Sequence, residues 1–166
     1  MITLLLGGAR SGKSAIAERL ATEGAGGGPV TYMATGRATD TDMAARIARH
    51  RERRPTGWVT VEASGRDLPP ALRSATGMVL LDALGTWLVA FEEDFAADPK
   101  VLCDALRDRD GDTVVVSEEV GLGVHPSTAA GRRFRDALGE LNQAVAAIAD
   151  GVLLIVAGRV LSLEQR

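Results

Sequence analysis

The sequence predicts an α/β protein in which helices cover both faces of one mostly parallel β-sheet. Three observations support this fold class. Short apolar runs recur along the chain, helical segments separate them, and the first run ends in a glycine-rich phosphate-binding motif. Continuous apolar runs are expected of strands that are covered on both faces. Alternation of such strands with helices is typical of a layered α/β sheet.

Six apolar runs are expected to form strands, at residues 2–6, 30–34, 58–61, 78–81, 113–116 and 152–156. One helix begins inside the phosphate motif and covers residues 13–21. A second covers about residues 41–54, with candidate N-caps at residues 39–41, and Pro55 ends it. A third lies between residues 128 and 149, where apolar side chains recur every three or four positions. Asp150 and Gly151 are expected to stop it, with the glycine in the left-handed cap.

Length and composition set the broad class. The 166 residues are expected to form one domain, residues 1–166. A net charge of −3 argues against a protein that coats nucleic acid or an anionic membrane. The single cysteine, Cys103, cannot form an internal disulfide, which fits the cytoplasm. The first apolar run stops at two glycines, so we expect neither a signal peptide nor a membrane span.

The phosphate motif has the pattern G-x-x-x-x-G-K-[ST], with an expected strand before it and a helix after it. Its residues are Gly7, Gly8, Ala9, Arg10, Ser11, Gly12, Lys13 and Ser14. Glycines allow backbone N–H groups to turn around phosphate oxygens, and the helix N-terminus adds partial positive charge. Lys13 is expected to reach the terminal phosphates, and the Ser14 hydroxyl to bind Mg²⁺. We call this segment, residues 7–14, the phosphate cradle.

A magnesium-bound triphosphate usually needs an acidic residue at the end of a neighbouring strand. Asp82 follows one apolar run directly, and Glu118 and Glu119 follow another after one serine. Because Asp82 comes directly after its run, it is the favoured metal ligand. Each of these carboxylates could instead cap a helix or lie at a solvated strand end.

The expected helix at residues 41–54 is rich in arginine and contains His50. Residues three and four apart on a helix are neighbours, so His50 lies beside Arg46, Arg53 and Arg54. The positive charges favour the neutral imidazole, which is the nucleophilic form, and can hold an incoming triphosphate. The same spacing also describes a solvated basic face with an incidental histidine. The other histidine, His125, lies in a glycine-rich loop, where a structural or incidental role is the simpler interpretation.

In these segments the chain resembles the family of bifunctional adenosylcobinamide kinases and adenosylcobinamide-phosphate guanylyltransferases of cobalamin biosynthesis. The resemblance covers nearly the whole chain in order. The matching segments are the phosphate cradle, residues 32–35, residues 42–47 with His50 and Pro55, Trp58 and Glu62, residues 119–123 with Pro126, residues 134–136, residues 142–143 and residues 157–159. The helix around His50 and the Glu-Val-Gly-x-Gly loop are far more specific than the cradle, which many families share.

The resemblance implies two reactions. ATP or GTP first phosphorylates the aminopropanol hydroxyl of adenosylcobinamide, and GTP then transfers GMP to that phosphate through a guanylyl-histidine. The family's guanylylated histidine falls on His50. Its other nucleotide contacts fall on Thr35, Gly36, Arg37, Arg51, Glu52, Arg53, Arg54, Glu62 and Asp82. The family fold is a RecA-like P-loop sheet, and its assembly is a homotrimer. Apolar residues after Gly85, at Trp87, Leu88, Phe91 and Phe95, either form the subunit contact or simply cover the sheet.

Three positions depart from the family pattern: Asp82 stands in place of Glu, Gly36 in place of Ser, and His125 in place of an apolar residue. They affect fine nucleotide selectivity rather than the reaction class. Another small-molecule P-loop kinase, without a covalent intermediate, is the main alternative. A regulatory GTPase is disfavoured because Asn142 is the only asparagine and no lysine follows it. A nucleotide sensor without turnover would not need a histidine among arginines.

Overall fold

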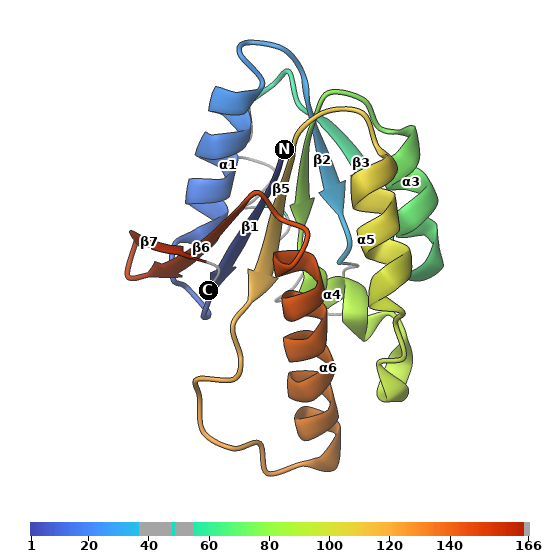
Figure 1. Ribbon diagram of the computed structural model, residues 1–166, viewed down its shortest axis with the longest axis vertical. Helices are drawn as coiled ribbons and strands as arrows, with labels where there is room; N and C mark the ends of the chain where they lie inside the picture. Colours follow the sequence, from blue (N-terminus) through green and yellow to red (C-terminus); the bar gives the residue numbers. More distant parts are fainter. Residues whose placement is uncertain (37–47, 49–54, 165–166) are drawn as a thin grey trace.

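The computed structural model describes residues 1–36, 48 and 55–164, and its centre is a seven-stranded β-sheet (Figure 1). Its strands are β1 (Ile2–Gly7), β2 (Val30–Ala34), β3 (Val59–Glu62), β4 (Met78–Asp82), β5 (Thr113–Glu118), β6 (Gly151–Val156) and β7 (Arg159–Leu163). Their order in the sheet is β3-β2-β4-β5-β1-β6-β7. Strands β1 to β6 are parallel, and β7 pairs antiparallel with β6.

The strand order confirms the RecA-like arrangement. Strand β1, which leads into the phosphate cradle, lies inside the sheet between β5 and β6. Strand β5 separates β1 from β4, so the strand beside the cradle is not the one that ends in Asp82. All six parallel strands end at the same edge of the sheet, which we call the cradle edge. Ligands of open α/β sheets bind at this edge.

The principal helices are α1 (Lys13–Gly24), α3 (Leu68–Ser74), α4 (Leu84–Val89), α5 (Pro99–Asp108) and α6 (Ala129–Ala146). Two short 3-10 turns, η1 (Gly65–Asp67) and η2 (Glu92–Asp94), precede α3 and α5. Asp98 caps α5 through its side chain, and Thr128 caps α6 in the same way. In the part of the chain that the structure describes, no helix combines the length and apolarity that crossing a membrane requires.

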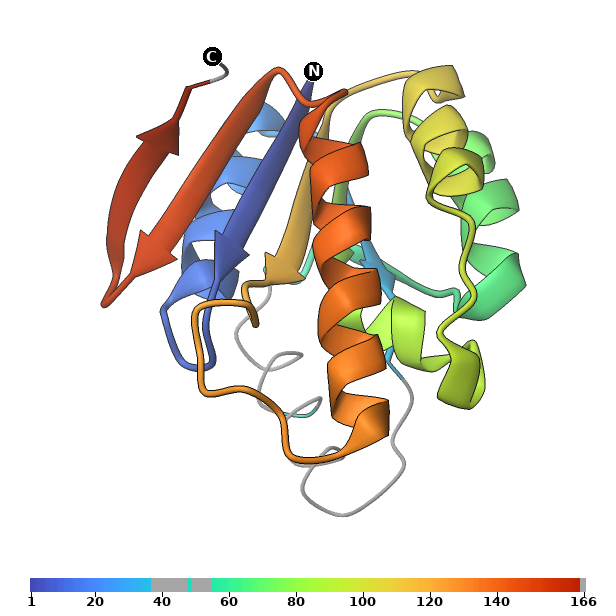
Figure 2. The same ribbon diagram turned by 60° about the horizontal axis from the view of Figure 1, so that its bottom comes forward.

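The helices form a layer on each side of the sheet (Figure 2). Successive residues of β1 point to opposite faces, as the pleat of a strand requires. Leu4 and Leu6 enter one buried cluster with side chains of α3 to α6, whereas Leu5 enters a second cluster with Ala17 and Ala21 of α1. Each strand in the middle of the sheet therefore needs apolar residues at every position. This is why β1, β4 and β5 are continuous apolar runs.

All six predicted strands are present, with small shifts. The third begins at Val59 rather than Trp58, and the fifth extends to Glu118. Strand β7 was not predicted, because its residues are all exposed and give no continuous buried run. The predicted helix at residues 41–54 lies outside the described residues except for Ala48, which is helical.

The predicted end of the third helix is wrong. Helix α6 ends at Ala146, and Gly151 is the first residue of β6 rather than a left-handed cap. Asp150 does not cap the helix but forms two hydrogen bonds with Ile2. Its carboxylate accepts the backbone N–H of Ile2 at 2.6 Å, and its own N–H donates to the Ile2 carbonyl at 2.8 Å. The Asp-Gly pair thus fastens the start of β6 to β1.

The aromatic residues after Gly85 cover the sheet, as the second of the two interpretations proposed. Trp87 and Leu88 are each only 1% exposed. The alternative prediction, that they form an exposed subunit contact, is therefore wrong for both residues. The Trp87 indole donates to the Gly65 carbonyl at 2.7 Å and meets Phe91 edge to face. Phe95 makes a similar contact with Phe134 of α6.

Candidate active site

The phosphate cradle joins the end of β1 to the start of α1, as predicted. Two of its residues have left-handed backbone, Arg10 with φ 56° and Gly12 with φ 95°. Gly12 directly precedes Lys13, the first residue of α1, so it makes the turn that aims the helix N-terminus at the loop. Unpaired N–H groups at that terminus form an anion site.

Gly7 and Gly12 lie where the chain passes close to other backbone. A Cβ on Gly7 would lie 2.8 Å from the Ile155 carbonyl oxygen and 2.6 Å from the Ser11 hydroxyl. A Cβ on Gly12 would lie 3.3 Å from the Cα of Gly158, in the turn between β6 and β7. The same turn donates the Gly158 N–H to the Ser11 carbonyl at 2.8 Å. The β6–β7 turn therefore supports the cradle, a role that no chemical signal in the sequence indicated.

Lys13 lies in the cradle with only 5% of its surface exposed. Its ammonium donates to the Gly8 carbonyl at 3.3 Å and lies 3.9 Å from a carboxylate oxygen of Glu118. An ammonium has three donors, and within the described part of the chain a single hydrogen bond occupies one of them. Lys13 therefore keeps donor capacity for phosphate oxygens.

The two acidic residues approach the cradle from different strands. Glu118 is the register partner of Gly7, and Asp82 lies one strand further away, paired with Val116 and Ala34. Asp82 accepts the Tyr32 hydroxyl at 2.5 Å. The residue next to Lys13 is thus Glu118, which the sequence had placed second to Asp82.

The Glu118 carboxyl is held in a partly buried position between α4 and the cradle. One of its oxygens accepts the Gly85 N–H at 3.2 Å. Burial is the main cause that raises the pKa of Glu118. The Lys13 ammonium opposes this shift, and the negative charge of Asp82 adds to it. The two carboxylates and Lys13 therefore form one electrostatic group.

A buried polar pair fixes the end of β5 where Glu118 lies. Asn142 of α6 accepts the Ser117 hydroxyl at 2.6 Å and donates to the Glu118 carbonyl at 3.1 Å. Asn142 is 7% exposed and Ser117 is fully buried. Sequence reasoning gave Asn142 no role at the site, because its partners are 24 and 25 residues away.

Thr35 serves a similar purpose for the end of β4. Its hydroxyl lies 2.7 Å from the Ala83 carbonyl, 3.0 Å from the Ala83 N–H nitrogen and 2.6 Å from the Thr86 hydroxyl. Thr35 is 1% exposed, and these contacts tie the end of β2 to the turn that follows Asp82. Gly36 follows Thr35, and a Cβ on Gly36 would lie 3.5 Å from the Thr86 side chain.

The remaining predicted residues fall into two groups. Glu62 is exposed at the end of β3, at the cradle edge, and is the register partner of Ala34. The others lie outside the described residues: Arg37, His50, Arg51, Glu52, Arg53 and Arg54. The structure brings Lys13, Glu118 and Asp82 together, and it places Thr35 and Glu62 along the same edge.

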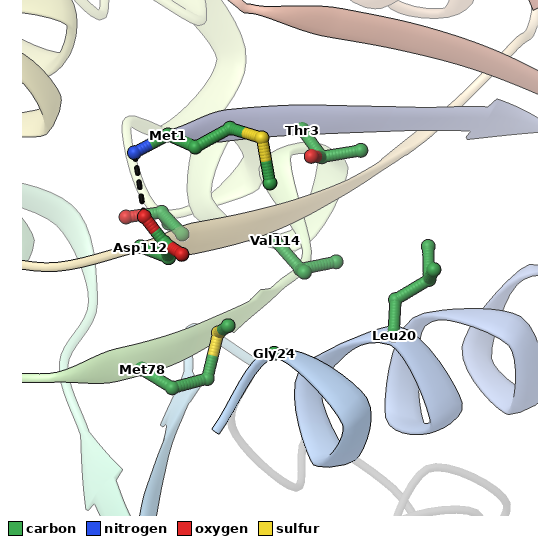
Figure 3. A pocket seen from close by; sticks show the side chains of 8 residues that line it. Met1, Thr3, Leu20, Gly24, Met78, Asp112 and Val114 are labelled. Carbon is green, nitrogen blue, oxygen red and sulfur yellow. Dashed lines mark hydrogen bonds and ion pairs between the residues drawn. The ribbon is translucent and has the colours of Figure 1, made fainter. Parts of the chain in front are cut away.

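A shallow pocket lies at the opposite edge, where the strands begin (Figure 3). It is lined by Met1, Thr3, Leu20, Gly24, Met78, Asp112, Thr113 and Val114. The N-terminal ammonium meets Asp112 at 2.6 Å beside it. Because the cradle lies at the other end of the strands, this pocket is not part of the candidate site.

Comparison with known proteins shows the family to which the chain belongs. Residues 3–163 match the family model of cobinamide kinase / cobinamide phosphate guanyltransferase. A "bifunctional adenosylcobalamin biosynthesis protein CobP" of Pseudomonas aeruginosa is 42% identical, covering 95% of this chain and 94% of the relative. Proteins called "bifunctional adenosylcobalamin biosynthesis protein CobU" from Salmonella typhimurium and Escherichia coli are 39% and 35% identical. Each alignment with them covers 95% of this chain and 97% of the relative.

The family match and the cradle geometry lead to the same conclusion. The match begins in β1 and ends in β7, so it includes the cradle, both acidic residues and the turn that supports the cradle. This chain belongs to the cobinamide kinase / cobinamide phosphate guanyltransferase family.

Proposed function

We propose that this protein phosphorylates adenosylcobinamide and then transfers GMP from GTP to adenosylcobinamide phosphate, giving adenosylcobinamide-GDP and pyrophosphate. The observation that carries the proposal is the phosphate cradle with Lys13 buried in it, in a chain that matches the family along nearly its whole length. Both reactions break a phosphoanhydride bond of a nucleoside triphosphate. One cradle can therefore serve both of them in turn.

The cradle residues fit a triphosphate. A Cβ on Gly8 would meet no atom within 4 Å, so the loop is open at that point. The Ser11 hydroxyl is buried and, among the described residues, has no hydrogen-bond partner. Phosphate oxygens are strong acceptors for such donors. The hydroxyl of Ser14 and the carboxylates of Asp82 and Glu118 are the oxygen ligands that Mg²⁺ prefers.

In the kinase step, the aminopropanol hydroxyl attacks the γ-phosphorus of ATP or GTP, the bond to the β–γ bridging oxygen breaks, and the hydroxyl proton is released to solvent. Lys13 and the N-terminus of α1 stabilise the negative charge on the phosphate oxygens. Bound Mg²⁺ supplies further charge neutralisation, with Ser14 and Asp82 as its proposed protein ligands. The carboxylate of Glu118, at the end of β5, forms an ion pair with the Lys13 ammonium and so helps to position it.

In the transfer step, a ring nitrogen of His50 attacks the α-phosphorus of GTP, and pyrophosphate leaves. A phosphate oxygen of adenosylcobinamide phosphate then attacks the same phosphorus, and the bond to His50 breaks. Further nucleotide contacts are proposed for Thr35, Gly36, Arg37, Arg51, Glu52, Arg53, Arg54 and Glu62. For Thr35 the backbone is the better candidate contact, because its hydroxyl is already surrounded by the turn after Asp82.

Three further properties belong to the proposal: one domain over residues 1–166, a homotrimer and a cytoplasmic location. The trimer needs a contact other than Trp87 and Leu88, since both are buried within the subunit. Light scattering at micromolar concentration tests it, and a monomer mass would contradict it.

Labelling with GTP that carries a tag on the α-phosphate tests the covalent step. Wild-type protein is expected to retain the label after denaturation, in a bond that is acid-labile and base-stable, as a phosphoramidate is. His50→Ala is expected to lose both label and guanylyl transfer, while phosphorylation of adenosylcobinamide persists. His125→Ala is the matched control, because His125 is the other histidine and lies exposed in the loop after β5. Kinase activity with no label on the wild type would favour a P-loop kinase without a covalent intermediate.

A further inference from the structure

The loop between β5 and α6, residues 119–128, presents two aliphatic side chains to solvent beside the candidate active site. Leu122 is 82% exposed and Val124 is 96% exposed. These are the largest exposed fractions among the large hydrophobic residues that the structure describes. The loop leaves the end of β5 at the cradle edge and runs away from the sheet to the start of α6 (Figure 1).

The loop is anchored to α6 at its far end. Arg132 donates to the Pro126 carbonyl at 2.9 Å and to the Ser127 carbonyl at 3.2 Å. Arg135 donates to Nδ1 of His125, also at 2.9 Å. The helix itself comes close, since a Cβ on Gly131 would lie 3.0 Å from the Cβ of Pro126.

The near end of the loop is anchored too. The Gly121 N–H donates to the Glu119 carboxylate at 2.6 Å, and the Glu119 N–H donates to the Gly7 carbonyl in the cradle. Leu122 and Val124 therefore lie on a segment that is held at both ends, with their side chains directed outward.

The loop also begins next to Glu118 and Lys13 of the candidate active site. Glu118 lies 3.9 Å from the Lys13 ammonium, and Leu122 is four residues further along the chain. Four residues of extended backbone span at most about 14 Å. The Cα of Leu122 is therefore within that distance of the Cα of Glu118, which lies at the cradle edge.

We propose that Leu122 and Val124 form the apolar contact for the corrin ring of adenosylcobinamide, an inference that rests on the proposed function. The ring is a large macrocycle with apolar faces and amide side chains, and its aminopropanol arm carries the reacting hydroxyl. When the arm reaches into the cradle, the ring has to lie just outside the cradle edge. By themselves, two side chains cover far less than the roughly 800 Å² per partner that a subunit interface typically buries. They suit one face of a bound macrocycle.

Kinase assays that vary each substrate separately test the proposal. For the double variant Leu122→Ser/Val124→Ser, we expect KM for adenosylcobinamide to rise at least about tenfold, because two aliphatic contacts are lost. KM for the nucleotide should change by less than about twofold, since the phosphate cradle is untouched. Val59→Ser is the matched control, an exposed valine at the opposite end of the sheet, and both of its KM values should match the wild type.

The outcomes separate the two proposals. If the wild type does not phosphorylate adenosylcobinamide, the proposed function fails. If it does, and the double variant keeps the wild-type KM for the corrinoid, the loop assignment is overturned. A change in the oligomeric mass of the double variant, measured by light scattering, also overturns it, because the loop then belongs to a subunit interface. A corrinoid-specific rise in KM at unchanged mass supports it.

Discussion

Two buried cations at opposite edges of the sheet show how the protein separates structure from function. Arg109 lies at the edge where the strands begin, 6% exposed, and Lys13 lies at the cradle edge, 5% exposed. The Arg109 guanidinium donates to the carbonyls of Gly77, Gly111 and Asp112 and to the Thr113 hydroxyl, at 2.5 to 2.9 Å. Among the residues that the structure describes, the Lys13 ammonium donates only to the Gly8 carbonyl and lies 3.9 Å from Glu118. One cation is nearly saturated by its own chain, and the other keeps its donors for a ligand.

The number of partners explains the choice of residue. A planar guanidinium with five fixed donors can close several backbone turns at once, which is what Arg109 does between β4 and β5. An ammonium on a flexible stem can follow a phosphate group during a reaction. Loss of Arg109 should therefore reduce stability, and loss of Lys13 should reduce activity.

The largest effect is expected from Lys13→Ala. Removing a charge that stabilises the transition state typically costs about 2.7–4 kcal/mol, or about 100- to 1,000-fold in rate. Both the kinase and the guanylyltransferase rates should fall together, because both use one cradle, while the melting temperature changes little. Lys100→Ala is the matched control, since Lys100 is the only other lysine and is exposed on α5. Full transferase activity in Lys13→Ala would mean that the second reaction uses another site.

The next effect is expected from Arg109→Met, measured as the free energy of unfolding in denaturant. The substitution removes the guanidinium donor from the carbonyls of Gly77 and Gly111, and an unsatisfied buried group costs about 1–3 kcal/mol. The Asp112 carbonyl also loses this donor but keeps the Val79 N–H at 2.9 Å. We expect a loss of about 3 kcal/mol or more, with both KM values unchanged. Arg107→Met, at an exposed position on α5, is the control. A stable Arg109→Met protein with altered KM would reverse the comparison.

The smallest effect is a pH trend at Glu118. Because burial raises the pKa of Glu118 in the folded protein, the folded state holds this proton more tightly than the unfolded state. The contribution of Glu118 to stability is therefore fully present below the unfolded pKa and is lost as pH rises through the folded pKa. The melting temperature of Glu118→Gln relative to the wild type should rise from about pH 4 towards pH 7.

Glu140→Gln, at an exposed position on α6, is the control for this trend and should show none. A relative melting temperature of Glu118→Gln that falls as pH rises would mean that Lys13, rather than burial, dominates at this carboxylate.

The sequence predicted the cradle almost completely, since residues 7–14 are local in the chain and the flanking strand and helix are strong patterns. It could not decide between Asp82 and Glu118. That choice depends on the order of strands in the sheet, which places β5 rather than β4 beside β1. The roles of Thr35 and Asn142 were missed for the same reason, because their hydrogen-bond partners come from other elements. Strand β7 was missed because its apolar residues, Val160, Leu161 and Leu163, are interrupted by Ser162 and do not form one of the continuous runs by which the other strands were found.

The support that the β6–β7 turn gives the cradle also affects how the protein is made on the ribosome. The cradle leaves the exit tunnel well before the strands that flank it, because both neighbours of β1 begin more than 100 residues later, at Thr113 and Gly151. The Gly158 N–H that holds Ser11 arrives later still. During that interval of translation, β1 is an apolar strand without its partners, which is a hazard for aggregation. The cradle is thus made long before the strands and the turn that complete it, and the growing chain must keep Ile2 to Leu6 covered until they arrive.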